Sequence, residues 1–262
     1  MLRETALPMM FFIVTYLQFH WIFNLPLLLF AGALAGTAFW QGPVLMTGAL
    51  VLVVVMIFTT PWDNYAVAQG IWGFPRERYS VKVWHLPVEE YAFFIIESVQ
   101  VMLLTFWLLT VLPEAGGAGG GWSLTDPRLG IAVAVVLLAW LGLGLWGRKK
   151  IHARSRYHYA WHLLFWFVPV ILLQWVIAWD VILPRWPAIL AATLGVGTYL
   201  SWADYLAIDR GIWHFDQKQI TGHKIGRKMP WEEAVFFLSD SLFGGAKFCH
   251  VAAGGFEVKE LA

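Results

Sequence analysis

Charged residues are scarce in this 262-residue chain, since Asp, Glu, Lys and Arg together make up 13% of it. A soluble globular domain carries about a quarter charged residues, so a soluble enzyme is not expected. The formal net charge of +1 gives no basic surface for nucleic acid, and no nucleic-acid partner is expected. The single cysteine, Cys249, excludes a disulfide within the chain and a cysteine-based metal site.

Hydrophobic residues, by contrast, make up 59% of the chain and fall into long runs. A helix needs about 20 apolar residues to cross the hydrocarbon core of a membrane. Runs of that length lie at approximately 10–37, 43–61, 88–112, 128–147, 158–182, 187–208 and 231–253. We therefore predict an all-α, polytopic membrane protein with about seven transmembrane helices, the first of them kinked at Pro26.

The positive charges are distributed unevenly between the segments that connect these runs. Fourteen of the 18 Lys and Arg residues fall at position 3 and within 62–87, 148–157 and 209–230, which alternating spans place on one side. Positive residues gather on the cytoplasmic side of membrane proteins. This asymmetry predicts a multi-pass protein of the cytoplasmic membrane, with its N-terminus in the cytoplasm and its C-terminus outside.

The two halves of the chain repeat one pattern on either side of a glycine-rich stretch, 116–121. The first copy contains Trp62-Asp63, Gly70-Ile71-Trp72 and Pro87-Val88-Glu89-Glu90; the second contains Trp202, Asp204, Gly211-Ile212-Trp213 and Pro230-Trp231-Glu232-Glu233. A weaker match pairs Phe19-His20 and Pro26 with Trp161-His162 and Pro169. We predict two parallel three-helix repeats, 1–112 and 151–262, joined by an outside loop and a linker helix within 113–150. Such a 3+1+3 duplication builds its site between the repeats.

Each repeat places an aspartate at the inner end of one span and two glutamates at the start of the next. Proline followed by glutamate is also typical of an ordinary helix N-terminus, where it caps the helix and complements its dipole. Two copies weaken that interpretation, because capping does not require Asp63 and Asp204 to recur upstream. The pattern favours a functional site at one membrane face.

Glu97 and Asp240 lie seven residues, or two helical turns, after Glu90 and Glu233. They therefore share a helix face with those glutamates and lie about 10 to 15 Å deeper in the membrane. Ionisable residues at that depth are candidates for function. The alternative is a buried polar pair that holds two helices together.

Three other features carry weaker signals. His158 and His162 are one turn apart without a third ligand at suitable spacing, so no metal site is expected. Gly142, Gly144 and Gly147 have the spacing of a dinucleotide motif but follow no strand. Lys247 matches the position of a retinal Schiff base only loosely, and we expect its ammonium to reach the outer membrane surface.

The segments Pro61-Trp62-Asp63-Asn64, Pro87 to Phe94 and Pro230 to Phe237 together resemble the membrane-integral lycopene cyclase family. The resemblance covers nearly the whole chain, from Phe19 through the second Pro-x-Glu-Glu helix, and is to the fused tandem form. It implies cyclisation of the linear ψ-ends of lycopene to β-ionone rings, giving γ- or β-carotene, without net oxidation or reduction. We expect no cofactor and no metal.

That reaction needs a general acid, a water-poor pocket for a tertiary cation and a base. A carboxyl in an apolar site retains its proton and can donate it at neutral pH. We hypothesise acid and base roles for Glu89 or Glu90 with Glu232 or Glu233, orienting or relay roles for Asp63 and Asp204, and deeper partner roles for Glu97 and Asp240.

Three other functions stay open at the level of sequence. A 3+1+3 small-molecule transporter shares the predicted architecture. A membrane prenyltransferase-like enzyme would hold Mg²⁺ on its acidic residues and a diphosphate on basic ones. A retinal-binding protein would use Lys247. The sequence leaves the oligomeric state undetermined.

Overall fold

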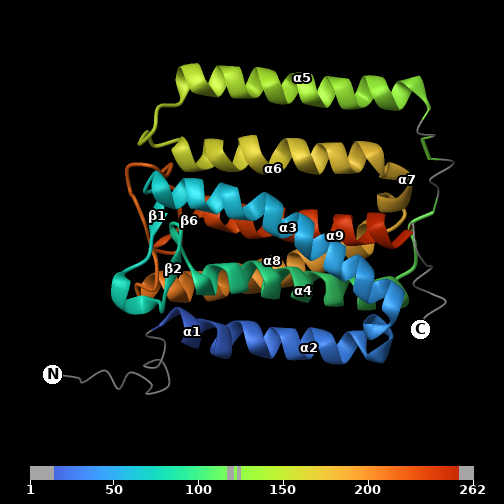
Figure 1. Ribbon diagram of the computed structural model, residues 1–262, viewed down its shortest axis with the longest axis horizontal. Coiled ribbons are helices and arrows are strands. Elements are labelled where there is room, and N and C mark those ends of the chain that lie inside the picture. Colours follow the sequence, from blue (N-terminus) through green and yellow to red (C-terminus); the bar gives the residue numbers. More distant parts are fainter. Residues whose placement is uncertain (1–14, 117–120, 123–124, 254–262) are drawn as a thin grey trace.

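The computed structural model describes residues 15–116, 121–122 and 125–253, which form a bundle of long helices lying side by side (Figure 1). The long helices are α3 (Gly42–Ala68), α4 (Val88–Val111), α5 (Pro127–Lys150), α6 (His158–Ile177), α8 (Trp186–Asp209) and α9 (Trp231–Ala253). A further helical stretch, residues 16–35, comprises α1 (Tyr16–Phe19), a π-helical turn (His20–Asn24) and α2 (Leu25–Ala35). Short elements complete it: α7 (Trp179–Ile182) and 3₁₀ turns at Thr37–Trp40 and Arg76–Arg78.

Five of these helices are long and apolar enough to cross a membrane, namely Tyr16–Ala35, α3, α4, α5 and α6. The predicted all-α membrane fold is therefore confirmed. Helices α8 and α9 have similar lengths, are not among the five, and pack against each other and against α4 inside the bundle. Much of the predicted linker 116–121 and both ends of the chain lie outside the described residues.

The first span continues through its proline. Pro26 lies at the start of α2, directly after the π-helical turn. Proline lacks an N–H and crowds the carbonyl four residues earlier, and the wider π-turn accommodates both effects. The single span expected from the sequence is therefore present within residues 16–35, and it contains a π-helical turn just before Pro26.

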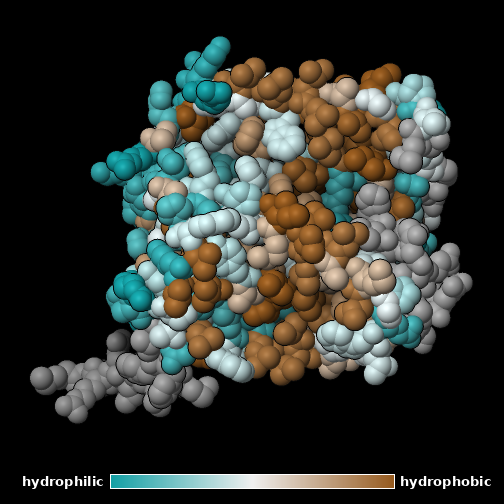
Figure 2. Space-filling view, viewed as in Figure 1, coloured by the Kyte–Doolittle hydropathy of each residue, from teal (hydrophilic) through white to brown (hydrophobic). Residues whose placement is uncertain are grey.

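Small β-elements gather at one end of the bundle, on the left in Figure 1. Hairpin β2–β3 (Lys82–Val83, Leu86–Pro87) leads into α4, and hairpin β5–β6 (Lys224–Ile225, Met229–Pro230) leads into α9. Strand β1 (Trp72–Gly73) pairs with β4 (His214–Phe215) and so joins the two halves of the chain. Hydrophilic residues concentrate at this hairpin end, while hydrophobic residues cover much of the remaining face (Figure 2).

The linker helix α5 lies at the edge of the bundle and packs mainly against α6 (Figure 1). A Cβ atom on Gly147 would lie 1.9 Å from Trp161 Cζ2, and one on Gly144 would lie 3.0 Å from Phe165 Cε2. Small residues let membrane helices approach closely. These glycines therefore serve helix packing, whereas a Cβ on Gly142 would meet nothing within 4 Å.

The buried core has two parts of different composition. The part nearest the hairpins is rich in aromatic rings, including Tyr16, Trp62, Trp72, Tyr159 and Trp213. The other part, toward the opposite end, contains mostly aliphatic and small residues such as Val51, Leu103 and Ala192. The candidate site lies within the aromatic part.

Candidate active site

A small cavity between the two halves of the chain is lined by four carboxyl groups, one each from α3, α4, α8 and α9. They belong to Asp63, Glu90, Asp204 and Glu233. The remaining lining consists entirely of aromatic side chains: Tyr16, Trp62, Trp72, Phe74, Phe93, Tyr159, Trp213, Phe215, Phe236 and Phe237. The cavity volume is about 30 Å³, enough for about one water molecule.

Two buried tyrosines hold the two glutamates. Tyr16 Oη donates to Glu90 Oε2 at 2.7 Å, and Tyr159 Oη donates to Glu233 Oε2 at 2.6 Å. Such hydrogen bonds to a carboxyl are short and strong when the acceptor is charged. The two contacts are equivalent, which gives the glutamates matching orientations in the two halves.

Neither tyrosine was expected from the sequence to belong to the site, although one signal points to them. Tyr16 and Tyr159 each stand ten residues before a proline, Pro26 and Pro169 respectively. This register places the two tyrosines at equivalent positions, so the pairing of His20 with His162 in the weaker sequence match is one residue out. The two histidines accordingly have different hydrogen-bond partners. His20 Nε2 donates to Glu89 O in α4, whereas His162 Nε2 donates to Trp62 O in α3.

Two tryptophans hold the two aspartates in the same way. Trp72 Nε1 donates to Asp63 Oδ1 at 2.9 Å, and Trp213 Nε1 donates to Asp204 Oδ1 at 2.7 Å. Both tryptophans belong to the repeated Gly-Ile-Trp segments, to which the sequence assigned no role. Each lies nine residues after the aspartate that it contacts.

The glycine of each Gly-Ile-Trp segment explains how the tryptophan returns to the aspartate. Gly70 and Gly211 have φ values of 68° and 67°, a left-handed conformation that glycine adopts without strain. The next residue, Ile71 or Ile212, donates its N–H to a carbonyl five residues earlier. This is the Schellman ending of a helix, and it turns the chain back toward the cavity.

Aromatic contacts cross between the halves and make them one site. The Tyr16 ring lies 5.0 Å from the Trp213 ring, and the Tyr159 ring lies 5.1 Å from the Trp72 ring, measured between centroids. The β1–β4 pairing fixes the segments that carry both tryptophans. Each glutamate is therefore held by a tyrosine that contacts the tryptophan of the other half.

The other glutamate of each Pro-x-Glu-Glu motif points away from the cavity. Glu89 Oε1 accepts from Ser80 N and Ser80 Oγ at 2.8 and 2.7 Å, and Glu232 Oε1 accepts from Thr221 N at 2.7 Å. Consecutive helical residues point about 100° apart, so only the second glutamate of each motif lines the cavity. The first glutamate of each motif instead accepts hydrogen bonds from the loop that precedes its helix.

The deeper pair, Glu97 and Asp240, lies outside the cavity lining. Glu97 has no exposed surface, and neither of its carboxylate oxygens has a hydrogen-bond partner among the described residues. It interacts electrostatically with Asp240 across α4 and α9, and more weakly with Glu90 and Glu233. The structure thus brings the pair together beneath the cavity.

Lys247 does not reach the membrane surface as expected. Its side chain is 8% exposed, and its Nζ lies 3.6 Å from the centroid of the Phe243 ring and interacts with Asp240. The expectation fails because α9 is an interior helix that packs against α3, α4, α6 and α8.

His158 and His162 are also placed inside the protein, where they do not meet a third ligand. His158 Nδ1 bonds to Gln219 Oε1 at 2.7 Å, and His162 stacks on Trp62. Within the part of the chain that the structure describes, no group of three or more His, Cys, Asp or Glu is placed to hold a metal ion.

Comparison with known proteins gives a consistent result. A family model described as lycopene cyclase matches residues 5–112 and 156–250. Lycopene beta-cyclase of Halobacterium salinarum is 32% identical over 194 residues, which cover 74% of this chain and 77% of that protein. No solved structure matches the chain significantly.

Longer proteins match as well. The bifunctional lycopene cyclase/phytoene synthase of Phycomyces blakesleeanus is 28% identical over 239 residues, covering 86% of this chain and 37% of that protein. The protein of the same description from Phaffia rhodozyma is 28% identical over 248 residues, covering 87% and 35% respectively. This chain therefore corresponds to about a third of each bifunctional relative.

Proposed function

The chain belongs to the lycopene cyclase family, and from this premise we propose that it converts the linear ψ-ends of lycopene to β-ionone rings. The observation that carries the proposal is the buried cavity, in which two matched sets of carboxyl groups meet inside an aromatic enclosure. A hydrocarbon offers no group for polar recognition, so the site must act through protons and apolar contacts.

The reaction balances without a cofactor. An acid adds a proton to C2 of the terminal C1=C2 double bond, which leaves a tertiary cation at C1. The C5=C6 electron pair then forms the C1–C6 bond and moves the positive charge to C5. A base removes the proton from C6 and restores the C5=C6 double bond, so the product has the mass of lycopene.

Glu90 and Glu233 act as the acid and the base. Both line the cavity, and each is oriented by one tyrosine hydrogen bond, which is the positioning that proton transfer requires. Asp63 and Asp204 lie beside them as proton relays, fixed by the tryptophan N–H groups. Glu97 and Asp240, two turns further along α4 and α9, are the deeper partners of these acids.

The aromatic lining stabilises the cation. Aromatic faces attract a positive charge, and the attraction reaches about 2 kcal/mol when water is excluded. The lining also keeps out water that would capture the cation. A cavity of about 30 Å³ is too small for the end group of a carotenoid, so the enclosure opens to admit substrate and closes for the reaction.

The protein has the 3+1+3 arrangement and lies in the cytoplasmic membrane. The two family matches flank α5, and matching tyrosine and tryptophan contacts recur in both halves, which supports the repeats 1–112 and 151–262 with a linker in 113–150. Arg and Lys residues of the loops around the hairpins support an inside location for that end, with the N-terminus in the cytoplasm and the C-terminus outside. No specific observation favours the transporter, prenyltransferase or retinal-binding alternatives.

The test is conversion of lycopene by the purified protein in lipid nanodiscs, carried out in parallel in H₂O and D₂O. The expected product is β- or γ-carotene of unchanged mass in H₂O, with one deuterium per ring in D₂O. Unchanged lycopene, with the protein shown to be folded, would contradict the proposed activity. A cyclic product without deuterium would contradict the proton-donating carboxyl.

A further inference from the structure

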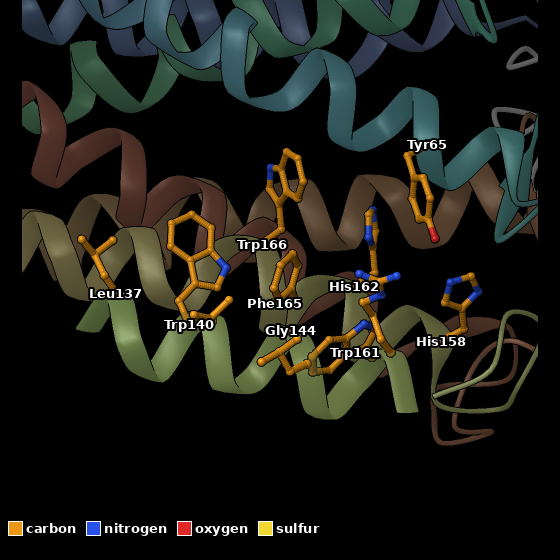
Figure 3. Close-up of a pocket in the computed structure, with 12 residues that line it drawn as sticks. Tyr65, Leu137, Trp140, Gly144, His158, Trp161, His162, Phe165 and Trp166 are labelled. Carbon is orange, nitrogen blue, oxygen red and sulfur yellow. The ribbon is translucent and has the colours of Figure 1, made fainter. Parts of the chain in front are cut away.

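A second cavity, much larger than the one at the carboxyls, lies between α5 and α6 (Figure 3). Its volume is about 590 Å³, within the range of small-molecule sites. We call it the linker groove; its lining is Tyr65, Leu137, Trp140, Leu141, Gly144, Leu145, Arg148, His158, Trp161, His162, Phe165 and Trp166. The surface that it offers is overwhelmingly apolar, with Arg148 and His158 at the end nearest the hairpins.

The linker groove shares a wall with the small cavity that the four carboxyl groups line, which we call the reaction cavity. Trp62 lines the reaction cavity, and its ring stacks on His162 of the groove with centroids 5.3 Å apart and planes 6° apart. The same two residues are joined by the bond from His162 Nε2 to Trp62 O at 3.2 Å. A single layer of two rings therefore separates the groove from the space that the carboxyls face.

The shape of the groove suits a long, narrow occupant. It follows α5 from Leu137 to Arg148, a distance of about 16 Å at the helical rise. Figure 3 shows Leu137 and Trp140 from α5 facing Phe165 and Trp166 from α6. The groove runs from the middle of the bundle to the end at which the reaction cavity lies.

The groove is formed mainly by α5 and by α6 of the second half, and α3 of the first half contributes Tyr65. Helix α5, which forms its outer wall, falls between the segments that match the family model and packs mainly against α6. The reaction cavity itself has equivalent carboxyls on both sides. The larger cavity therefore owes its outer wall to α5, which lies outside the two repeats.

We propose that the linker groove binds the polyene chain of the carotenoid substrate, with the end group directed past Trp62 toward the carboxyls. This inference rests on the function proposed above. A linear carotenoid is a long, methyl-substituted hydrocarbon chain without polar groups, which matches the mostly aromatic and aliphatic walls of the groove. The groove also adjoins the reaction cavity, which is itself too small to hold the chain. A phospholipid is the rival occupant, because its phosphate would match Arg148.

Filling the groove from α5 tests the proposal. Leu137→Trp and Leu141→Trp each place a large ring in the groove, whereas Leu138→Trp makes the same change at a neighbouring exposed position that is absent from the lining. Each protein is purified from lycopene-accumulating cells in mild detergent. Bound carotenoid per protein is measured by visible absorption, and bound phospholipid by mass spectrometry.

We expect the two groove variants to retain about tenfold less carotenoid than the original chain, because overpacking excludes a ligand by that order, while Leu138→Trp retains the original amount. Their KM for lycopene rises more than their kcat falls. Equal pigment in all four proteins would overturn the proposal, as would loss of phospholipid alone from the groove variants.

The same experiment separates this inference from the proposed function. Pigment that is bound by the original chain and lost from the groove variants, without any cyclic product, would support the groove and contradict the cyclase activity. Cyclic product formed equally well by all four proteins would support the activity and overturn the groove. Normal thermal unfolding of at least one groove variant shows that its loss of pigment is not loss of fold.

Discussion

In the first half of the chain Tyr16 donates to Glu90, and in the second half Tyr159 donates to Glu233, at distances that differ by 0.1 Å. The surroundings of these pairs are not alike. The linker groove lies between α6 of the second half and the linker helix α5, and α3 of the first half contributes Tyr65 to its lining. The cavity carboxyls are thus matched in the two halves, whereas the groove that we propose for the substrate is built on α5, which lies outside the repeats. A site with equivalent carboxyls can therefore bind its substrate asymmetrically.

A second difference lies at the hairpins. Tyr91 donates its hydroxyl proton to Val83 O in hairpin β2–β3, and Asn64 Nδ2 donates to the Tyr91 hydroxyl. The position equivalent to Tyr91 in the second half is Ala234, which has no polar side chain. The Tyr91 hydroxyl therefore holds the first hairpin, whereas the second is held by other contacts, namely Lys224 Nζ to Gln217 Oε1 at 2.6 Å and the Lys228–Asp209 ion pair at 2.7 Å.

The largest expected effects come from the cavity glutamates taken one at a time. Glu90→Gln and Glu233→Gln should each lower turnover by about 10²–10⁴-fold, because each removes a proton-transfer group. The measurement is the initial rate of ring formation with equal amounts of each protein in nanodiscs. A difference between the two losses shows that the two halves are not equivalent in the reaction; full activity in either variant would contradict the proposed acid–base pair.

Removing the tyrosine hydroxyls should have a smaller effect. Tyr16→Phe and Tyr159→Phe keep the rings but remove the hydrogen bond to the glutamate, and such a bond accounts for about 10- to 100-fold in rate when the acceptor is charged in the reaction. The ratio of kcat to the original value is measured for each variant. Unchanged kcat in both would show that the tyrosines only fill space.

Gly147→Leu tests the contact that holds the linker helix. Its Cβ would lie 1.9 Å from Trp161, and overpacking of this kind costs about 1–3 kcal/mol. We expect a lower unfolding midpoint in a thermal or denaturant titration. Gly142→Leu, on the open side of α5, is the matched control and should unfold as the original chain does; equal destabilisation of both would contradict the α5–α6 packing.

The smallest effect is expected at hairpin β2–β3, to which the Tyr91 hydroxyl is hydrogen-bonded. Tyr91→Phe removes a hydroxyl with two hydrogen-bond partners, at a cost of about 1 kcal/mol in unfolding free energy. Turnover should stay close to that of the original chain, since Tyr91 is not part of the cavity lining. A large loss of turnover would show that the hairpin controls the site.

Much of the fold could be predicted from sequence because its signals are local. Apolar runs located the helices, and the recurrence of Asp63 and Asp204 with the Pro-x-Glu-Glu motifs located the acids. Sequence could not decide which glutamate of each motif lines the cavity, because that depends on how α4 and α9 are rotated within the bundle.

The remaining features depend on packing between distant segments. A lone Tyr16 near the start of a membrane helix is typical of an interface aromatic, and only its contact with Glu90, 74 residues away, gives it a role. Lys247 was placed wrongly because hydropathy does not show that α9 is enclosed by other helices. The linker groove likewise requires the three-dimensional position of α5.

The most direct test of the roles proposed for Glu90 and Glu233 compares two double variants in the same nanodisc assay. Glu89→Gln with Glu232→Gln keeps an acceptor oxygen for the Ser80 and Thr221 donors, and should retain ring formation within about tenfold of the original rate. Glu90→Gln with Glu233→Gln removes both cavity carboxyls of the acid–base pair and should abolish it. Retained ring formation in the second variant, with loss in the first, would contradict the assignment of the chemistry to the carboxyls inside the cavity.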